Sequence, residues 1–159
     1  MQNELVRTSS TIGESNLQVQ ITFSDRRDIF VDEEVLNLTK KYLLEKAEEM
    51  GLIVPALDCG PDHGHIFISN WKKHSIEKIA QGLKGYSSRM MRKHHFDLIK
   101  HKLWGEKFWS EGYFYRTVGA VTKDSVKFYV EHSQQKHWKA LDYDYYRYKK
   151  EQLRLDAFN

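Results

Sequence analysis

The sequence is poor in cysteine and in long apolar runs. Its one cysteine, Cys59, excludes a disulfide within the chain and argues against a cysteine-rich zinc module. No run approaches the roughly 18 apolar residues that span a bilayer, and the polar first residues lack the apolar stretch of a secretion signal. From these absences we expect a cytoplasmic protein without a membrane role.

Charge of one sign is not in large excess either. The 25 basic and 22 acidic residues give a formal net charge of +3, so composition alone does not indicate a nucleic-acid-binding protein. The distribution of the charges has to decide that question. The 159 residues, 40% of them hydrophobic, suffice for one well-buried core and are too few for two ordinary domains. A single domain is therefore predicted.

The apolar pattern predicts an α+β fold. Residues 17–23 alternate between apolar and polar, which is typical of a half-buried strand. A helix is predicted from Asp32, and Gly51 ends it. The other predicted elements are strands at 52–57, 65–69 and 113–118, a helix from Ser75 through Met90, a short helix or irregular segment at 96–104, and a helix at 122–138. This order predicts a ferredoxin-like or RNA-recognition-motif-like antiparallel sheet with helices on one face, followed by a C-terminal helix that carries Tyr129.

The chain divides into three predicted segments. Residues 1–16 show no clear period and are interpreted as a loose N-terminal extension, while residues 17–138 form the single domain. Residues 139–159 form a tail in which tyrosines lie among lysines and arginines. Such a tail could stack on bases and hold phosphates, or it could form a terminal helix that packs on its own domain or on a partner.

Two histidines lie one residue apart at the head of an apolar run. If His63 and His65 belong to a strand, both imidazoles project from the same side of the sheet and can share one metal ion. A tyrosine brought to that ion, with Tyr129 as the candidate, would be a nucleophile for phosphodiester cleavage through a covalent phosphotyrosine. Each half of the pattern alone also fits ordinary packing residues.

Several ordered blocks around these residues carry a family resemblance. They are residues 61–65 (PDHGH), residues 83–89 (LKGYSSR), residues 108–114 (FWSEGYF), and residues 117–119 (TVG) followed by Tyr129. From about residue 17 to residue 135, the chain resembles the small one-tyrosine transposases of bacterial and archaeal insertion sequences. These are members of the HUH nuclease superfamily that act on single-stranded DNA. The resemblance implies an enzyme that cleaves and rejoins single-stranded DNA at element ends through a 5′-phosphotyrosine.

The resemblance also implies a divalent ion, magnesium or manganese, that polarises the scissile phosphate and is held by His63 and His65. The family's third ligand is a glutamine one helical turn after the tyrosine, where this chain has Ser133. We favour Gln134 as that ligand because it restores the family's chemical group, with His132 as the alternative. The implied partners are DNA hairpins at the element ends and a second copy of the chain. In the implied homodimer, the tyrosine helix of one subunit completes the histidine site of the other.

A second departure from the family lies between the two histidines. The superfamily usually has a hydrophobic residue there, whereas this chain has Gly64. A glycine in a strand has no side chain to pack, so the sequence predicts the loss of a packing anchor and a looser strand.

Basic and aromatic residues near the motifs are candidates for DNA contacts. Each of the basic residues could equally be a solvated surface charge, and core packing is favoured for most of the aromatic ones. The basic candidates are Arg26, Arg27, Lys84, Arg89, Arg92 and Lys93, and the aromatic ones are Trp104, Phe108, Trp109 and Tyr113. Two other functions stay open: a noncatalytic nucleic-acid-binding module on the same fold, and a domesticated nuclease of the superfamily that processes chromosomal palindromes.

Overall fold

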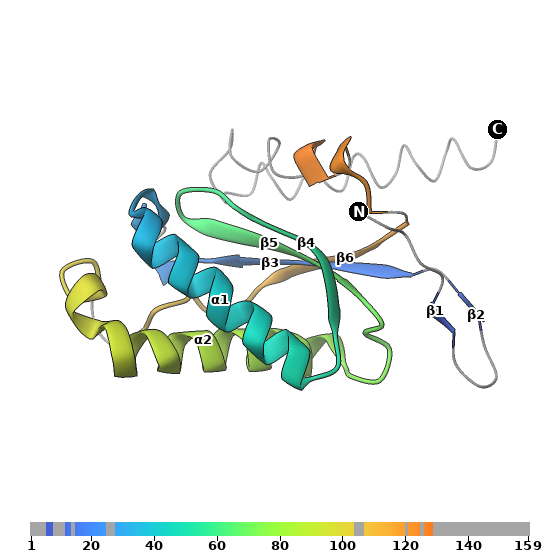
Figure 1. Ribbon diagram of the computed structural model, residues 1–159, viewed down its shortest axis with the longest axis horizontal. Helices are drawn as coiled ribbons and strands as arrows, with labels where there is room; N and C mark the ends of the chain where they lie inside the picture. The colour runs from blue at the N-terminus through green and yellow to red at the C-terminus, as the bar shows by residue number, and fades with distance from the viewer. Residues whose placement is uncertain are drawn as a thin grey trace.

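Four antiparallel strands form the central sheet of the protein (Figure 1). The computed structural model describes residues 6–7, 12–13, 15–24, 28–103, 107–119, 121–124 and 126–128. The strands are β3 (Asn16–Thr22), β4 (Ile53–Cys59), β5 (His63–Ser69) and β6 (Phe114–Val118), in the spatial order β4-β5-β3-β6. The first of these strands along the chain therefore lies inside the sheet, between the third and the fourth. This arrangement confirms the predicted ferredoxin-like α+β fold.

Strand β3 is buried on both of its faces. Leu17, Val19 and Ile21 have no exposed surface and belong to the main hydrophobic core. The residues that alternate with them project from the opposite face, yet Gln18 and Gln20 are buried as well. The sequence predicted a strand buried on one face only. The prediction differs because alternation of apolar and polar residues does not show whether the polar side chains are covered.

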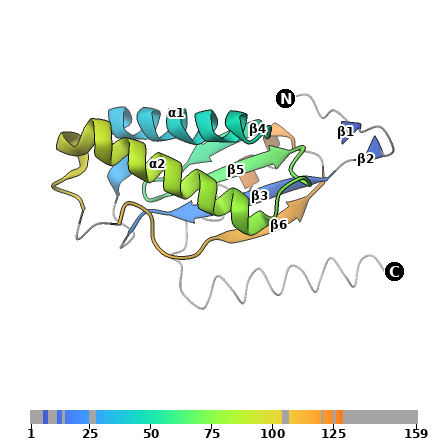
Figure 2. The same ribbon diagram turned by 90° about the horizontal axis from the view of Figure 1, so that it is seen from below.

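Helices α1 (Glu33–Glu49) and α2 (Ile76–Ile99) cover the same face of the sheet (Figure 2). The Asp32 side chain caps α1 by accepting hydrogen bonds from two backbone N–H groups, and the Ser75 hydroxyl caps α2 in the same way with one. Gly51, with φ +72°, follows α1 in the left-handed conformation that favours glycine. The predicted start of each helix is thus confirmed. We call the other side of the sheet, which these two helices leave uncovered, the open face.

Helix α2 is longer than the sequence pattern indicated. It continues to Ile99 across one non-helical residue, His95, with φ −135° and ψ 26°. The Tyr42 hydroxyl of α1 lies 2.7 Å from His95 Nε2. The irregular residue of α2 thus packs against α1. The segment that the sequence pattern indicated as separate, residues 96–104, begins as the last turn of α2.

Two of the sequence blocks meet in the core. Trp109 donates a hydrogen bond from Nε1 to the Ser87 hydroxyl at 2.9 Å, and both side chains are buried. Phe108 packs edge-on against Phe23, with ring centroids 5.1 Å apart. Phe108 and Trp109 are therefore core residues, which confirms the packing role that the sequence favoured for them. Trp104 lies outside the described residues.

The N-terminal stretch contains a short ladder that the sequence pattern did not indicate. Strand β1 (Val6–Arg7) pairs in antiparallel fashion with β2 (Ile12–Gly13). The predicted tail, residues 139–159, lies outside the described residues. Among the residues that are described, no helix combines the length and the apolar character needed to cross a membrane.

Gly64 faces the helix-covered side of the sheet, where another side chain takes its place. A Cβ atom at position 64 would lie 3.3 Å from Cys59 Sγ and 4.0 Å from Ile21 Cγ1. Cys59 is paired with Gly64 across β4 and β5. Its sulfur therefore fills space next to the missing side chain, and the two positions form a complementary pair. Burial also raises the pKa of the Cys59 thiol to about 12, as expected for a packing residue.

This complementarity predicts an energetic coupling. We expect the change in unfolding free energy caused by Gly64→Ala to be more favourable by about 0.5–1 kcal/mol in a Cys59→Ala background than in the wild type. The reason is that removal of Sγ clears the close contact. Urea unfolding of the four proteins of the double-mutant cycle measures this coupling. Gly85→Ala is the control, since a Cβ there meets no atom within 4 Å among the described residues, apart from the nearby backbone of its own helix. Equal effects of Gly64→Ala in both backgrounds would contradict the assignment.

Candidate functional site

The two histidines of the sequence motif project together from the open face of the sheet. His63 and His65 alternate along β5 with Gly64 and Ile66, which face the helices. The two imidazole rings lie 5.0 Å apart between centroids and are nearly perpendicular, at 84°. Only 1% and 0% of their surfaces are exposed. The predicted pairing of the two side chains is therefore observed.

Each imidazole is held through its Nδ1 atom. His63 Nδ1 lies 2.6 Å from a carboxylate oxygen of Asp62, and His65 Nδ1 lies 2.8 Å from the side-chain amide of Gln18. Neither Nε2 atom has a hydrogen-bond partner in the part of the chain that the structure describes. Buried polar atoms rarely remain unpaired, and neutral imidazole nitrogen is a common metal ligand. These two buried nitrogens therefore fit a metal ion.

The surroundings keep His65 in the neutral form that metal binding requires. Burial lowers the pKa of His65 well below its usual value, and the nearby charges of His63 and Arg116 act in the same direction. Across the described residues, no group of three histidine, cysteine, aspartate or glutamate side chains could hold a metal. A complete site needs another kind of ligand or one from elsewhere. Gln134, His132 and Ser133 all lie outside the described residues, so the third ligand stays a prediction.

Gln18 and Arg116 form a second layer behind His65. Arg116 of β6 donates from Nε to Gln18 Oε1 at 2.6 Å, and the other end of the Gln18 amide faces His65. The chain of contacts crosses three neighbouring strands, β6, β3 and β5. Sequence reasoning missed both residues, since Gln18 looks like the solvent-facing position of a half-buried strand. Only the strand register shows that it faces the histidine pair.

Gly60 is a further residue that the sequence identified only as part of a turn. A Cβ atom there would lie 2.4 Å from Cε1 and 2.9 Å from Nε2 of His63. Real Cβ atoms do not approach other atoms so closely. The absence of a side chain at position 60 therefore lets the His63 ring occupy its place.

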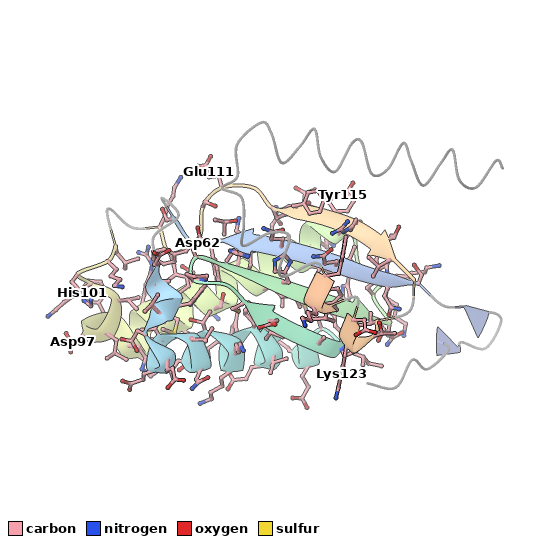
Figure 3. The ribbon with its side chains drawn as sticks, turned by 90° about the horizontal axis from the view of Figure 1, so that it is seen from above. Asp62, Asp97, His101, Glu111, Tyr115 and Lys123 are labelled. Atoms are coloured by element: carbon pink, nitrogen blue, oxygen red, sulfur yellow. The ribbon has the colours of Figure 1, made fainter. Side chains whose placement is uncertain are left out.

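The start of the predicted tyrosine helix packs on the same open face. Val121 and Val126 form a buried cluster with Phe67, which follows His65 on the same side of β5. Residues 123–124 and 126–128 are helical. Figure 3 looks onto this face and shows the segment at Lys123 lying over the sheet, with Asp62 near one end of the strands. Tyr129 itself lies outside the described residues, so its role stays a prediction.

The predicted phosphate-binding residues that the structure describes are not brought to the histidine pair. Four of them lie on α2, on the opposite side of the sheet from the imidazoles. Lys84 donates from Nζ to the Gly112 carbonyl at 2.8 Å, and the Arg89 guanidinium lies over the Tyr86 ring, 5.8 Å from its centroid. Arg92 is half-buried and Lys93 is exposed, while Arg26 and Arg27 lie outside the described residues. Contacts of the four α2 residues with DNA would have to use another surface than the histidine site.

Comparisons with known proteins identify the family of this chain. The family model described as "Transposase IS200 like" matches residues 13–133. The chain belongs to this family. The transposase is 33% identical over 98 residues to the ISDra2 transposase TnpA of Deinococcus radiodurans, and the match covers 62% of the transposase and 69% of that relative.

Solved structures share the fold of this transposase. A crystal structure of a Deinococcus radiodurans chain assigned as a transposase has a TM-score of 0.64 and 26% identity, over 82% of this chain and 98% of that chain. A REP-associated tyrosine transposase bound to a REP hairpin has a TM-score of 0.50 and 8% identity, over 84% of this chain and 74% of that chain. The second likeness shows the fold alone.

The depressed pKa of His65 predicts a pH-dependent stability. Unfolded His65 takes up a proton below about pH 6.5, whereas the folded imidazole does so only at lower pH. The contribution of neutral His65 to the free energy of unfolding is therefore complete above the pKa of the unfolded state. It is lost as the pH falls towards the pKa of the folded state. In EDTA, we expect His65→Gln to reduce the slope of unfolding free energy against pH in this window by up to about 1.4 kcal/mol per pH unit.

Urea unfolding at several pH values between about 7.5 and 5 measures this slope. His101→Gln is the matched control, because it makes the same substitution at an exposed histidine outside the site. The same slope in the wild type and in His65→Gln would show that His65 titrates alike in both states.

The close contact at Gly60 predicts a displaced ligand. Gly60→Ala should push the His63 ring aside, lower the free energy of unfolding by about 1–3 kcal/mol and weaken manganese binding by about tenfold or more. Urea unfolding and manganese titration test the two effects. Gly119→Ala should show neither, because a Cβ there meets no atom of the described residues beyond its chain neighbours within 4 Å. Unchanged manganese affinity in Gly60→Ala would contradict the role of this glycine.

Proposed function

We propose that this transposase cleaves and rejoins single-stranded DNA at the ends of an insertion sequence, with Tyr129 as the nucleophile and a 5′-phosphotyrosine as the intermediate. One observation carries the proposal: two buried imidazoles on the open face, with ring centroids 5.0 Å apart, leave both Nε2 atoms without a hydrogen-bond partner among the described residues. The chain segment that leads to Tyr129 packs on that same face through Val126. Metal ligands close to a tyrosine nucleophile would suit phosphoryl transfer.

His63 and His65 would hold the ion, with Gln134 as the proposed third ligand and His132 or Ser133 as alternatives. When bound there, magnesium or manganese supplies Lewis-acid polarisation of the scissile phosphate. The chain's own contribution is orientation. Asp62 and Gln18 fix the two rings through Nδ1, and burial excludes water from the ligand atoms.

The tyrosine step exchanges one phosphate ester for another. The Tyr129 oxygen loses its proton and forms a bond to phosphorus, while the bond to the 3′-oxygen breaks and that oxygen takes up a proton. A tyrosine hydroxyl ordinarily has a pKa of about 10, so charge relief on the phosphate oxygens is needed at neutral pH. The phosphotyrosine retains the energy of the phosphodiester. Attack by another 3′-hydroxyl then rejoins the strand without ATP.

The proposed substrate is a DNA hairpin near each end of the element, and the proposed location of the reaction is the cytoplasm. The proposed assembly is a homodimer with composite active sites. The hairpin bound by the REP-associated tyrosine transposase supports a hairpin partner. The homodimer, in which the tyrosine helix of one subunit completes the histidine site of the other, is proposed from the family resemblance. Lys84, Arg89, Arg92 and Lys93 on α2, with Arg26 and Arg27, remain the proposed phosphate contacts.

The proposal predicts the loss of a covalent adduct in one variant. Purified protein incubated with labelled single-stranded DNA of the element ends and manganese should form an adduct that EDTA abolishes. Tyr129→Phe should reduce adduct formation by at least about 1,000-fold and leave DNA affinity within about twofold, because only the nucleophilic oxygen is removed. Denaturing gels with mass spectrometry measure the adduct, and filter binding measures affinity.

Tyr115→Phe is the matched control, since Tyr115 is an exposed tyrosine of β6 and should keep full adduct formation. An adduct that persists in Tyr129→Phe would place the nucleophile elsewhere. Binding of the element ends without any wild-type adduct would favour the noncatalytic module. Cleavage restricted to chromosomal palindromes would favour the domesticated nuclease.

A further inference from the structure

The two imidazoles of the site are held by different kinds of partner. The Asp62 carboxylate can only accept a hydrogen bond, so His63 Nδ1 must carry the hydrogen in the 2.6 Å contact. A neutral imidazole carries one ring hydrogen. His63 Nε2 is therefore left with a lone pair, which is the state that binds a metal ion.

The contacts of His65 lead to the opposite tautomer. Arg116 Nε can only donate, so the Gln18 atom that lies 2.6 Å from it has to be the carbonyl oxygen, Oε1. The amide nitrogen of Gln18 then faces His65 Nδ1 at 2.8 Å and donates to it. Because Nδ1 accepts, the ring hydrogen lies on Nε2. In this state His65 Nε2 has no lone pair to offer.

From these contacts we propose that Gln18 is a positioning residue, held in place by Arg116, that keeps His65 in the tautomer unable to bind a metal ion. Uptake of the ion requires the Gln18 amide to turn over, so that Oε1 accepts a hydrogen from His65 Nδ1. The ring loses the hydrogen on Nε2 and gains one on Nδ1, with no net change in protons. Arg116 must release Gln18 in the same step, because the turned amide would present its own N–H groups to the guanidinium.

The inference rests on the proposed metal site and deepens it by naming what controls that site. Gln18 has no exposed surface, and its contact with Arg116 joins residues 98 positions apart in the sequence. Solvent therefore does not compete for the amide while the sheet is intact. Arg116 determines the orientation of Gln18, and Gln18 determines the tautomer of His65.

A single isosteric substitution should set the other tautomer permanently. In Gln18→Glu, the carboxylate accepts from His65 Nδ1 and from Arg116 at the same time, so no turn is needed. We expect manganese binding about tenfold tighter than in the wild type, the size of effect typical of residues that support a metal ligand. Gln20→Glu is the control, because it adds the same charge to the next position on the same face of β3.

The test uses the full chain without DNA. Long-range ¹H–¹⁵N spectra of histidine-labelled protein in EDTA report which ring nitrogen of His65 carries the hydrogen. The expected result is hydrogen on Nε2 in the wild type and in Gln20→Glu, and on Nδ1 in Gln18→Glu. Electron paramagnetic resonance of free manganese gives the affinities. Arg116→Met provides a second variant if Gln18→Glu does not fold, and should favour hydrogen on Nδ1 and tighter manganese binding.

The outcomes separate this inference from the proposed function. Hydrogen on Nδ1 of metal-free wild type, together with manganese binding, would overturn the inference and leave the metal site in place. Equal gains in affinity in Gln18→Glu and Gln20→Glu would assign the effect to charge and would also overturn it. If neither the wild type nor any of the variants binds manganese, the proposed metal site itself is overturned.

Discussion

The register of β3 between its two neighbours is the constraint on which the rest of the structure depends. One side of this strand supplies fully buried apolar residues to the core beneath α1 and α2. The other side supplies Gln18, which links Arg116 of β6 to His65 of β5. A shift of β3 by one residue would exchange its two faces, placing the amides in the apolar core and the aliphatic side chains against the imidazoles. Stability of the core and geometry of the site are therefore set by the same pairing.

The use of β3 for both the core and the site has an energetic cost. Two buried Nε2 atoms lack hydrogen-bond partners among the described residues, and a buried polar atom without a partner typically costs about 1–3 kcal/mol. The bonds made by the two Nδ1 atoms and the packing below the sheet offset that cost. A ligand that occupies both nitrogens would recover it, as is typical of sites that sacrifice stability for function.

Local patterns in the sequence were sufficient for much of the fold. Alternation predicted β3, and the sequence pattern placed the starts of both helices at Asp32 and Ser75, because these features depend on neighbours in the chain. The pairing of His63 with His65 was predictable for the same reason. Gln18 and Arg116 were not, since their partnership joins positions 98 residues apart. The contact that Gly60 permits was also hidden, because a turn glycine gives no sign of which ring lies over it.

The placement of β3 inside the sheet also has a consequence for the newly synthesised chain. Gln18 and His65 leave the ribosome well before Arg116, which belongs to the last strand of the sheet. The network around His65 therefore cannot close until β6 has been made and has paired with β3. Assembly of the site is a late, long-range event in folding, and such contacts form slowly. An unfinished chain thus contains both histidines but not the contacts of Gln18 and Arg116 around them, so the site takes its final arrangement only after β6 has been made.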